Sequence, residues 1–322
     1  MRQNLKSGFD LKKEERRIFF IFALTIVGYT VFALFGDIKK VVRASLTFDW
    51  RLLPLLIFLT SLNYLFRFIR WRYLLKKMDI DLPLVTSLRI FLSGLSMTVT
   101  PGKMGEVLKA YLVKKATKTN YAEMIPLLIF ERLTDGIGMI ILALGGLYLF
   151  RNLIFLFVFA VGLVATFFLF VLSKSYILRL IKRIEKSAGH VKILDFFILF
   201  FANSERLIKF QTLTVSVILS VIAWSFEGVA LFLLVSRFTV SSGVASLLFS
   251  LLVFSFSSIA GFIALIPGGI GVAEGSITSL IAYFYHLPLY EAIFITLLFR
   301  FITLWYGVAV GFFNLLLYFS RS

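Results

Sequence analysis

The chain of 322 residues has no cysteine and only two histidines, His190 and His286. The absence of cysteine excludes disulfides, thiol chemistry and thiolate metal sites. The two histidines lie far apart in the sequence, which argues against a histidine-based metal cluster. No carboxylate spacing typical of a metal site is present either. The sequence therefore predicts no metal and no cofactor.

Charged residues are also scarce, at 16% of the chain, whereas 60% of the residues are hydrophobic and 38 are Phe. A soluble domain has too little interior to bury so much apolar surface. Uncharged runs such as Ile18–Phe35 and Leu153–Ser173 are close to the ~20 apolar residues that cross a bilayer as a helix. The sequence thus predicts an all-α integral membrane protein.

Six segments are expected to be full spans, and two further segments are apolar but interrupted by Pro and Gly. The predicted spans are residues 18–35, 52–73, 121–150, 153–173, 213–238 and 289–319. The interrupted segments are 84–113, broken at Pro101, and 244–285, broken at Pro267. We interpret each as a broken or re-entrant hairpin, because its pieces are short for a full crossing. The total is eight helical spans if the hairpins also cross.

The net charge of +17 is concentrated in some of the predicted loops, above all in residues 1–17 and 174–210. Lys and Arg accumulate on the cytoplasmic side of membrane proteins, which places both termini in the cytoplasm and the protein in the cell (inner) membrane. The segment 174–210 is expected to lie on the membrane surface. Contact with anionic lipid explains the charge, so nucleic acid is not an expected partner.

Two similar stretches, SMTVTPGKMGEVLKAYL (96–112) and ALIPGGIGVAEGSI (264–277), contain the interruptions. Pro101 and Pro267 occupy matching positions in the two stretches, and Arg132 and Arg300 follow them at nearly the same offset. Each half reads as two spans, a broken hairpin and a long charged span. Because each half crosses three times, the second begins on the opposite face. We therefore expect a cytoplasmic N-terminus (1–17) followed by two inverted repeats, 18–150 and 151–319.

In carriers built from inverted repeats, segments interrupted by Gly and Pro mark a binding site near the bilayer midplane. Pro101 and Pro267 are expected to begin half-helices whose free N–H groups attract anions, with a simple kink as the alternative. Charges within spans usually face a partner or a wet cavity. The candidate substrate-binding residues are Pro101, Gly102, Lys103, Gly105, Glu106, Glu131, Arg132, Asp135, Glu227, Pro267, Gly268, Gly269, Gly271, Glu274 and Arg300.

Local spacing predicts some partners of these charges and leaves others open. Arg132 and Asp135, three apart on the span interrupted by ERLTDG, could pair, and Glu106 and Lys109 have the same spacing. Glu227 and Arg300 have no partner in their own spans, so Glu227 either pairs with another helix or handles substrate or protons. Arg67 and Arg70 are interpreted as side chains that snorkel to the inner interface, with a role in the site as the alternative.

Three stretches, LSGLSMTVTPGKMGEVLKAYLVKK, PLLIFERLTDGIGM and IPGGIGVAEGSI, resemble the lysylphosphatidylglycerol synthase transmembrane-domain family over about residues 15–320. That family includes the membrane part of multiple peptide resistance factors, a lipid flippase. The resemblance implies a lipid-handling membrane activity. Members that transfer an aminoacyl group carry a large soluble domain after the membrane part, and the chain printed here ends at Ser322, which argues against lysyl transfer.

The expected function is therefore a multi-pass lipid flippase or transporter rather than an enzyme. Its partners would be membrane lipids: an anionic or aminoacylated phospholipid, or a polyprenyl-phosphate-linked lipid. Two alternatives remain open, a membrane transferase acting on a lipid carrier and a non-catalytic membrane subunit. The subunit alternative includes a soluble partner bound at residues 174–210, and a homo-oligomer is also possible.

Overall fold

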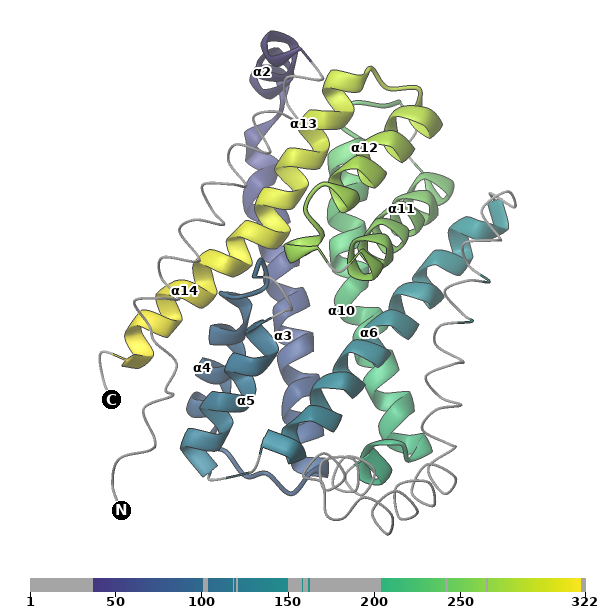
Figure 1. Cartoon of the computed structure of the whole chain (residues 1–322). Coiled ribbons are helices and arrows are strands. Elements are labelled where there is room, and N and C mark those ends of the chain that lie inside the picture. The colour runs from purple at the N-terminus through teal and green to yellow at the C-terminus, as the bar shows by residue number, and fades with distance from the viewer. Residues whose placement is uncertain are drawn as a thin grey trace, which may run out of the picture.

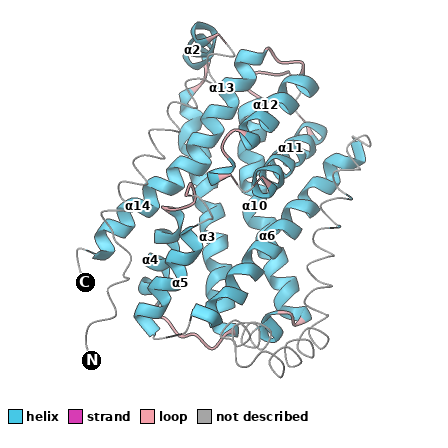
Figure 2. Ribbon diagram, in the orientation of Figure 1, coloured by secondary structure: helices cyan, strands magenta, loops and turns pink. Residues whose placement is uncertain are grey.

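The computed structural model describes most of the chain outside its N-terminus and one central stretch. The described residues are 37–100, 104–117, 119, 121–149, 158, 162, 204–240, 243–264 and 266–319. The predicted span 18–35, the span 153–173 except residues 158 and 162, and most of the basic segment 174–210 lie outside these residues. Every regular element within the described ranges is helical (Figure 2), which confirms the all-α prediction.

Four of the described helical segments are long and apolar enough to cross a membrane. They are Trp50–Lys77, Phe210–Val235, Val244–Ile263 and Leu289–Leu317. The first comprises a 3₁₀ turn (Trp50–Leu52) and helix α3 (Leu53–Lys77), with a proline in the first turn of α3, where its missing N–H costs nothing. The second is helix α10 (Phe210–Val235). These segments support a multi-pass membrane protein.

The two interrupted segments are broken where the sequence predicts. Helices α4 (Leu84–Leu95) and α5 (Met104–Thr117) form the first pair. Helices α11 (Val244–Ile263) and α12 (Val272–Tyr285) form the second, joined through a 3₁₀ turn at Pro267–Gly269. At 1.5 Å per residue, α4, α5 and α12 each reach only about 20 Å, less than the ~30 Å apolar core of a bilayer.

Helix α6 (Tyr121–Leu149) runs without a break through the charged sequence ERLTDG, which we expected to interrupt it. The last predicted span is also one continuous element. It consists of α13 (Leu289–Arg300), a π-helical turn (Phe301–Trp305) and α14 (Tyr306–Phe319). A π-helical turn often accompanies a functional site, and this one follows Arg300 directly.

The long helices pack in pairs that combine the two halves of the chain. Helix α3 lies along α10, α6 lies along α11, and α14 lies along α4 (Figure 1). The short helix α2 (Ile38–Thr47) contacts α13 at one end of the molecule. Residues from both halves therefore meet in the interior.

Two apolar cores occupy different levels of the bundle. Along α6, one core contains Met124, Leu127, Leu128 and Phe130, and the other contains Met139, Ala143 and Leu147. The charged residues of ERLTDG lie between these two levels on the same helix. Many large apolar side chains are also exposed, as expected for helices that face lipid. Examples are Phe58, Leu84, Val244, Tyr283, Phe301 and Phe313.

Candidate functional site

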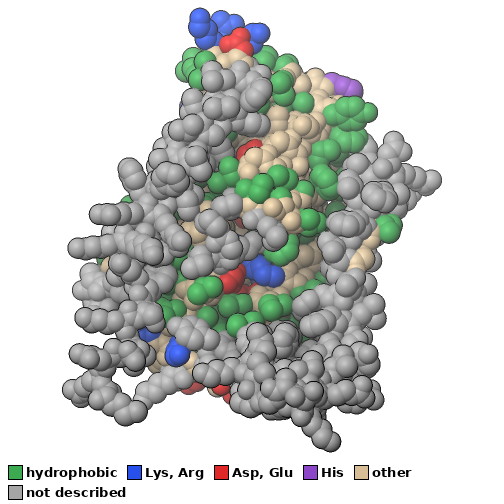
Figure 3. All heavy atoms as spheres, viewed as in Figure 1, with side chains coloured by type: hydrophobic (Ala, Val, Ile, Leu, Met, Phe, Trp, Pro, Cys, Tyr) green, Lys and Arg blue, Asp and Glu red, His purple; other side chains and the backbone are tan. Residues whose placement is uncertain are grey.

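A cavity of about 460 Å³ lies between the halves of the chain. Its walls come from α3, α4, α5, α6, α10, α11, α12, α13, the π-helical turn and α14, and from the Pro-Gly-Gly turn. Gly105 from the first hairpin and Gly268 and Gly269 from the second line it together. Figure 3 shows acidic and basic side chains near the middle of one face, surrounded by hydrophobic ones. The interrupted hairpins thus contribute to one polar space inside an apolar bundle.

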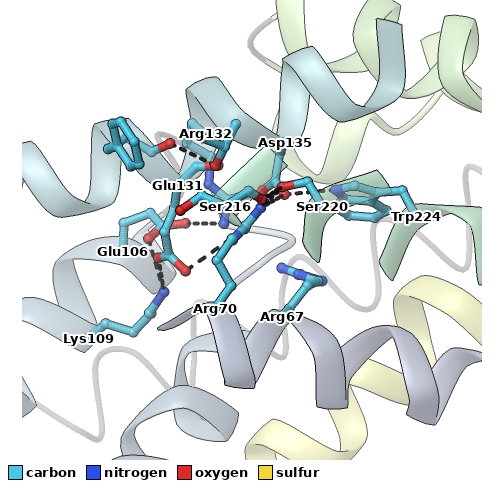
Figure 4. A network of polar contacts seen from close by, with 12 residues as sticks. Arg67, Arg70, Glu106, Lys109, Glu131, Arg132, Asp135, Ser216, Ser220 and Trp224 are labelled. Carbon is cyan, nitrogen blue, oxygen red and sulfur yellow. Dashed lines mark hydrogen bonds and ion pairs between the residues drawn. The ribbon is translucent and has the colours of Figure 1, made fainter. Parts of the chain in front are cut away.

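Six charged side chains on one side of the cavity form what we call the ion network: Arg70, Glu106, Lys109, Glu131, Arg132 and Asp135 (Figure 4). The shortest contacts are 2.6 Å between Arg70 Nη1 and Asp135 Oδ1, and 2.6 Å between Lys109 Nζ and Glu131 Oε2. Arg132 Nη2 lies 2.8 Å from Glu106 Oε1. Three positive and three negative groups cancel, which makes their burial tolerable.

The pairs predicted from local spacing are present within this network. Arg132 Nη1 lies 3.3 Å from Asp135 Oδ2, and Lys109 Nζ lies 3.6 Å from Glu106 Oε2. Both pairs are three residues apart on one helix, so their side chains share a face. The shorter contacts, however, join different helices: α3 to α6 through Arg70, and α5 to α6 through Lys109 and Arg132.

Asp135 also connects the ion network to α10. Its Oδ1 accepts a hydrogen bond from Trp224 Nε1 at 2.7 Å, and Arg70 Nη1 donates to Ser220 Oγ. The interpretation of Arg70 as a snorkelling side chain is wrong. Arg70 is only 1% exposed, because two carboxylates and a hydroxyl on neighbouring helices surround its guanidinium.

On the other side of the cavity, Arg300 pairs with Glu274, with Nε and Oε1 2.7 Å apart. Arg300 Nη2 also donates to the carbonyl oxygen of Gly268 in the Pro-Gly-Gly turn. Arg300, which has no partner in its own span, thus finds one on α12. The interaction fixes the turn against the last long helix.

The start of α12 differs from the prediction. Pro267 begins only the 3₁₀ turn, and α12 begins five residues later at Val272, so the expectation that Pro267 begins the half-helix is wrong. Gly268, Gly269 and Gly271 have φ values of 61°, 67° and 90°, which glycine adopts without strain. Gly271 N–H donates to Glu274 Oε2 at 2.7 Å. The protein's own carboxylate therefore already satisfies part of this helix end.

Arg67 and Glu227 line the cavity outside the ion network. The Arg67 guanidinium lies over the Trp224 ring, 4.9 Å from its centroid, and Nη1 donates to Asn63 Oδ1 at 3.4 Å. Arg67 therefore faces the cavity rather than the inner interface. Glu227 is 6% exposed and has no hydrogen bond or ion pair to any residue that the structure describes.

The structure brings most of the predicted residues to the cavity. Those that line it are Gly105, Glu106, Arg132, Asp135, Glu227, Gly268, Gly269 and Arg300. Glu131 and Glu274 pair with lining side chains, and Pro267 and Gly271 shape the adjoining turn. Pro101, Gly102 and Lys103 lie outside the described residues.

Four residues of the site are absent from the predicted set: Arg67, Arg70, Lys109 and Trp224. The three-residue spacing between Glu106 and Lys109 could have identified Lys109 as a site residue. Trp224 lies three residues before Glu227, on the same face of α10, which was a weaker signal. No local pattern distinguishes Arg70 from an arginine at a membrane interface.

A comparison with known protein families matches residues 20–311 to the family described as Lysylphosphatidylglycerol synthase TM region. The chain belongs to this family. It is similar to a UPF0104 membrane protein of Methanothermobacter thermautotrophicus, with 23% identity over 319 residues and 91% of each chain covered. It is also similar to a UPF0104 membrane protein of Methanocaldococcus jannaschii, with 27% identity over 181 residues, which cover 55% of this chain and 74% of that one.

Membership in the lysylphosphatidylglycerol synthase TM family agrees with the apolar helices described above. The match covers both interrupted hairpins and every residue that lines the cavity. The family and the fold together describe a multi-pass membrane protein related to lipid flippases.

Proposed function

We propose that the protein moves a lipid with a polar, phosphate-bearing head group across the membrane. The observation that carries the proposal is the charged cavity, which lies between two apolar cores and receives residues from both interrupted hairpins. Such a space offers a head group a polar passage through the apolar layer. Membership in a flippase-related family supports the same activity.

The lining of the cavity suits a lipid as well as its head group. Arg67 lines the cavity and has no ion pair to any described residue, and a guanidinium group binds phosphate through paired hydrogen bonds. Phe262, Ile263 and Ile266 line the same cavity and are 46%, 40% and 41% exposed. An apolar edge of this kind gives the lipid chains a place beside the polar chamber, so that the chains can stay in the bilayer.

An inverted repeat would supply the alternation that movement across the membrane needs. Its support comes from one constant offset along the chain. Helix α12 begins and ends the same number of positions after helix α5. Helix α13 begins that same number of positions after helix α6. The packing of α6 on α11 corresponds to that of α14 on α4. Rocking of one half against the other would expose the cavity to each side in turn.

Purified protein in liposomes that contain tail-labelled phospholipids tests this proposal. We expect labelled lipid in the inner leaflet to become accessible to a membrane-impermeant quencher faster than in protein-free liposomes. Arg67→Gln should slow this by about tenfold, because it removes a charged hydrogen-bond donor from the cavity. Arg206→Gln, in an exposed ion pair with Asp79, serves as the matched control. A panel of phospholipids that all move at the protein-free rate would refute the proposal.

A further inference from the structure

The charges that line the cavity point to the class of head group it accepts. We propose that the protein binds a zwitterionic head group, with its phosphate at Arg67 and its ammonium group at Glu227. This inference rests on the proposed function, since it names the lipid class that the same cavity takes. It concerns two residues that lie outside the ion network.

The first argument is the charge balance. The ion network is neutral, and Arg300 is paired with Glu274. Among the described residues that line the cavity, Arg67 and Glu227 are the charged side chains without an ion pair. They have opposite signs, so the charges of the described residues balance, and one group of each sign is left without an ion pair. An isolated charge in an apolar surrounding is costly unless it is compensated.

The second argument is the geometry of α3 and α10, which pack along each other. Asn63 Nδ2 donates to the carbonyl oxygen of Ala223 at 2.8 Å, which fixes the contact between the two helices. Arg67 then lies over Trp224, one helical turn from Glu227. The two charges are thus close neighbours across the helix pair.

Arg67 and Glu227 nevertheless do not form an ion pair or a hydrogen bond with each other. Asn63 Oδ1 and the Trp224 ring hold the guanidinium instead. Figure 4 shows Arg67 beside the ion network, with no dashed line to any residue drawn there. The arrangement leaves two opposite charges facing one space, which a ligand with both charges can fill.

The third argument comes from the ligand classes that fit worse. A purely anionic phosphate head group would satisfy Arg67 and leave the Glu227 carboxylate without a cation, close to the added negative charge. A purely cationic ligand would do the reverse. A phosphate joined to a primary ammonium group by a short linker satisfies both, through the planar donors of arginine and the N–H donors of the ammonium.

Binding of tail-labelled lipids to the detergent-purified protein tests the inference directly. The probes are phosphatidylethanolamine, which has phosphate and ammonium, and phosphatidylglycerol, which has phosphate alone. We expect phosphatidylethanolamine to bind about tenfold more tightly, since only it donates a charged hydrogen bond to Glu227. Glu227→Gln should remove this preference, mainly by weakening phosphatidylethanolamine. Arg67→Gln should weaken both lipids.

Two matched control variants distinguish a loss of binding from a loss of folding. Asp79→Asn and Arg206→Gln neutralise one carboxylate and one guanidinium in an exposed ion pair outside the cavity, and both should retain the preference. The ratio of the two affinities in the unsubstituted protein needs no variant at all. Equal affinity for the two lipids there, or an unchanged ratio in folded Glu227→Gln, overturns the inference.

The same lipids in the liposome assay separate this inference from the proposed function. Movement of both lipids at equal rates, with equal binding, refutes the zwitterionic site and leaves the flippase proposal intact. Preferential binding without movement supports the site and refutes the flippase. Soluble glycerophosphoethanolamine has the same head group without chains. Weak competition by it supports a lipid ligand, whereas competition equal to that of the lipid supports a soluble zwitterion at the same site.

Discussion

Asp135 contacts three side chains of the site: Arg70, Arg132 and Trp224. It lies 2.6 Å from Arg70, which is 1% exposed, and its other oxygen is 3.3 Å from Arg132. The substitution Asp135→Asn keeps the size of the side chain and can keep an acceptor for Trp224. It removes the charge, so Arg70 is left with Glu131 at 4.0 Å as its nearest carboxylate.

Removing one partner of a buried ion pair costs about 3–5 kcal/mol, because the remaining charge is uncompensated. We therefore expect the free energy of unfolding of Asp135→Asn to fall by that amount. The melting temperature should fall on the order of 10 °C. Thermal unfolding in detergent, followed by tryptophan fluorescence, measures the change. Asp79→Asn, in the exposed pair with Arg206, is the control and should change stability by less than about 1 kcal/mol.

A second variant decides whether charge compensation is the cause. Adding Arg70→Met to Asp135→Asn removes the uncompensated charge, so the double variant should be more stable than the sum of the two single losses predicts. Additive losses would contradict the reasoning, since they would mean that the two residues stabilise the protein independently. A melting temperature unchanged by Asp135→Asn alone would contradict it equally.

Two further predictions concern the interrupted hairpins. Gly105→Ala should destabilise the protein by about 1–3 kcal/mol, because the added Cβ would collide with the backbone carbonyl of Gly94. The melting temperature measures this loss. The control is Gly275→Ala, whose Cβ would meet no atom within 4 Å and which should be neutral or slightly stabilising. Glu274→Gln should lower the rate of lipid movement in liposomes by about tenfold or more, because the charge-assisted hydrogen bond from Arg300 is lost. A rate equal to that of the unsubstituted protein would show that this ion pair is not needed for transport.

The sequence predicted the helical elements well, because their signals are local. Pro101 and Pro267 marked both interruptions, and the long apolar runs gave α10 and the α13–α14 element to within a few residues. The continuity of α6 could not be predicted in the same way. ERLTDG is unsuited to an apolar helix until Asp135 meets Arg70, 65 residues earlier in the chain.

Long-range partners also explain which site residues the sequence misplaced. Arg70 and Arg67 lie near a basic helix end, where local composition favours an interfacial arginine. Their surroundings come from α6 and α10, and no spacing within α3 reveals these helices. Glu274 has a local role as well, since it accepts from Gly271 N–H three residues earlier. That pattern, an acidic residue in the first turn of a helix, was readable, and it would have placed the start of α12 after Pro267.

The two halves share one ion pair and differ in almost every other charge. Glu106 with Arg132 and Glu274 with Arg300 are related by the same offset as helices α5 and α12, and each pair joins a hairpin to the following long helix. At that offset, the positions of Lys109, Glu131 and Asp135 hold Ile277, Phe299 and Thr303. The ion pair between hairpin and long helix is present in both halves, whereas the other charges of the ion network are not. We therefore associate this pair with the hairpin architecture. The charges found in one half alone also include Arg67 on α3 and Glu227 on α10, the two residues that we propose bind the head group.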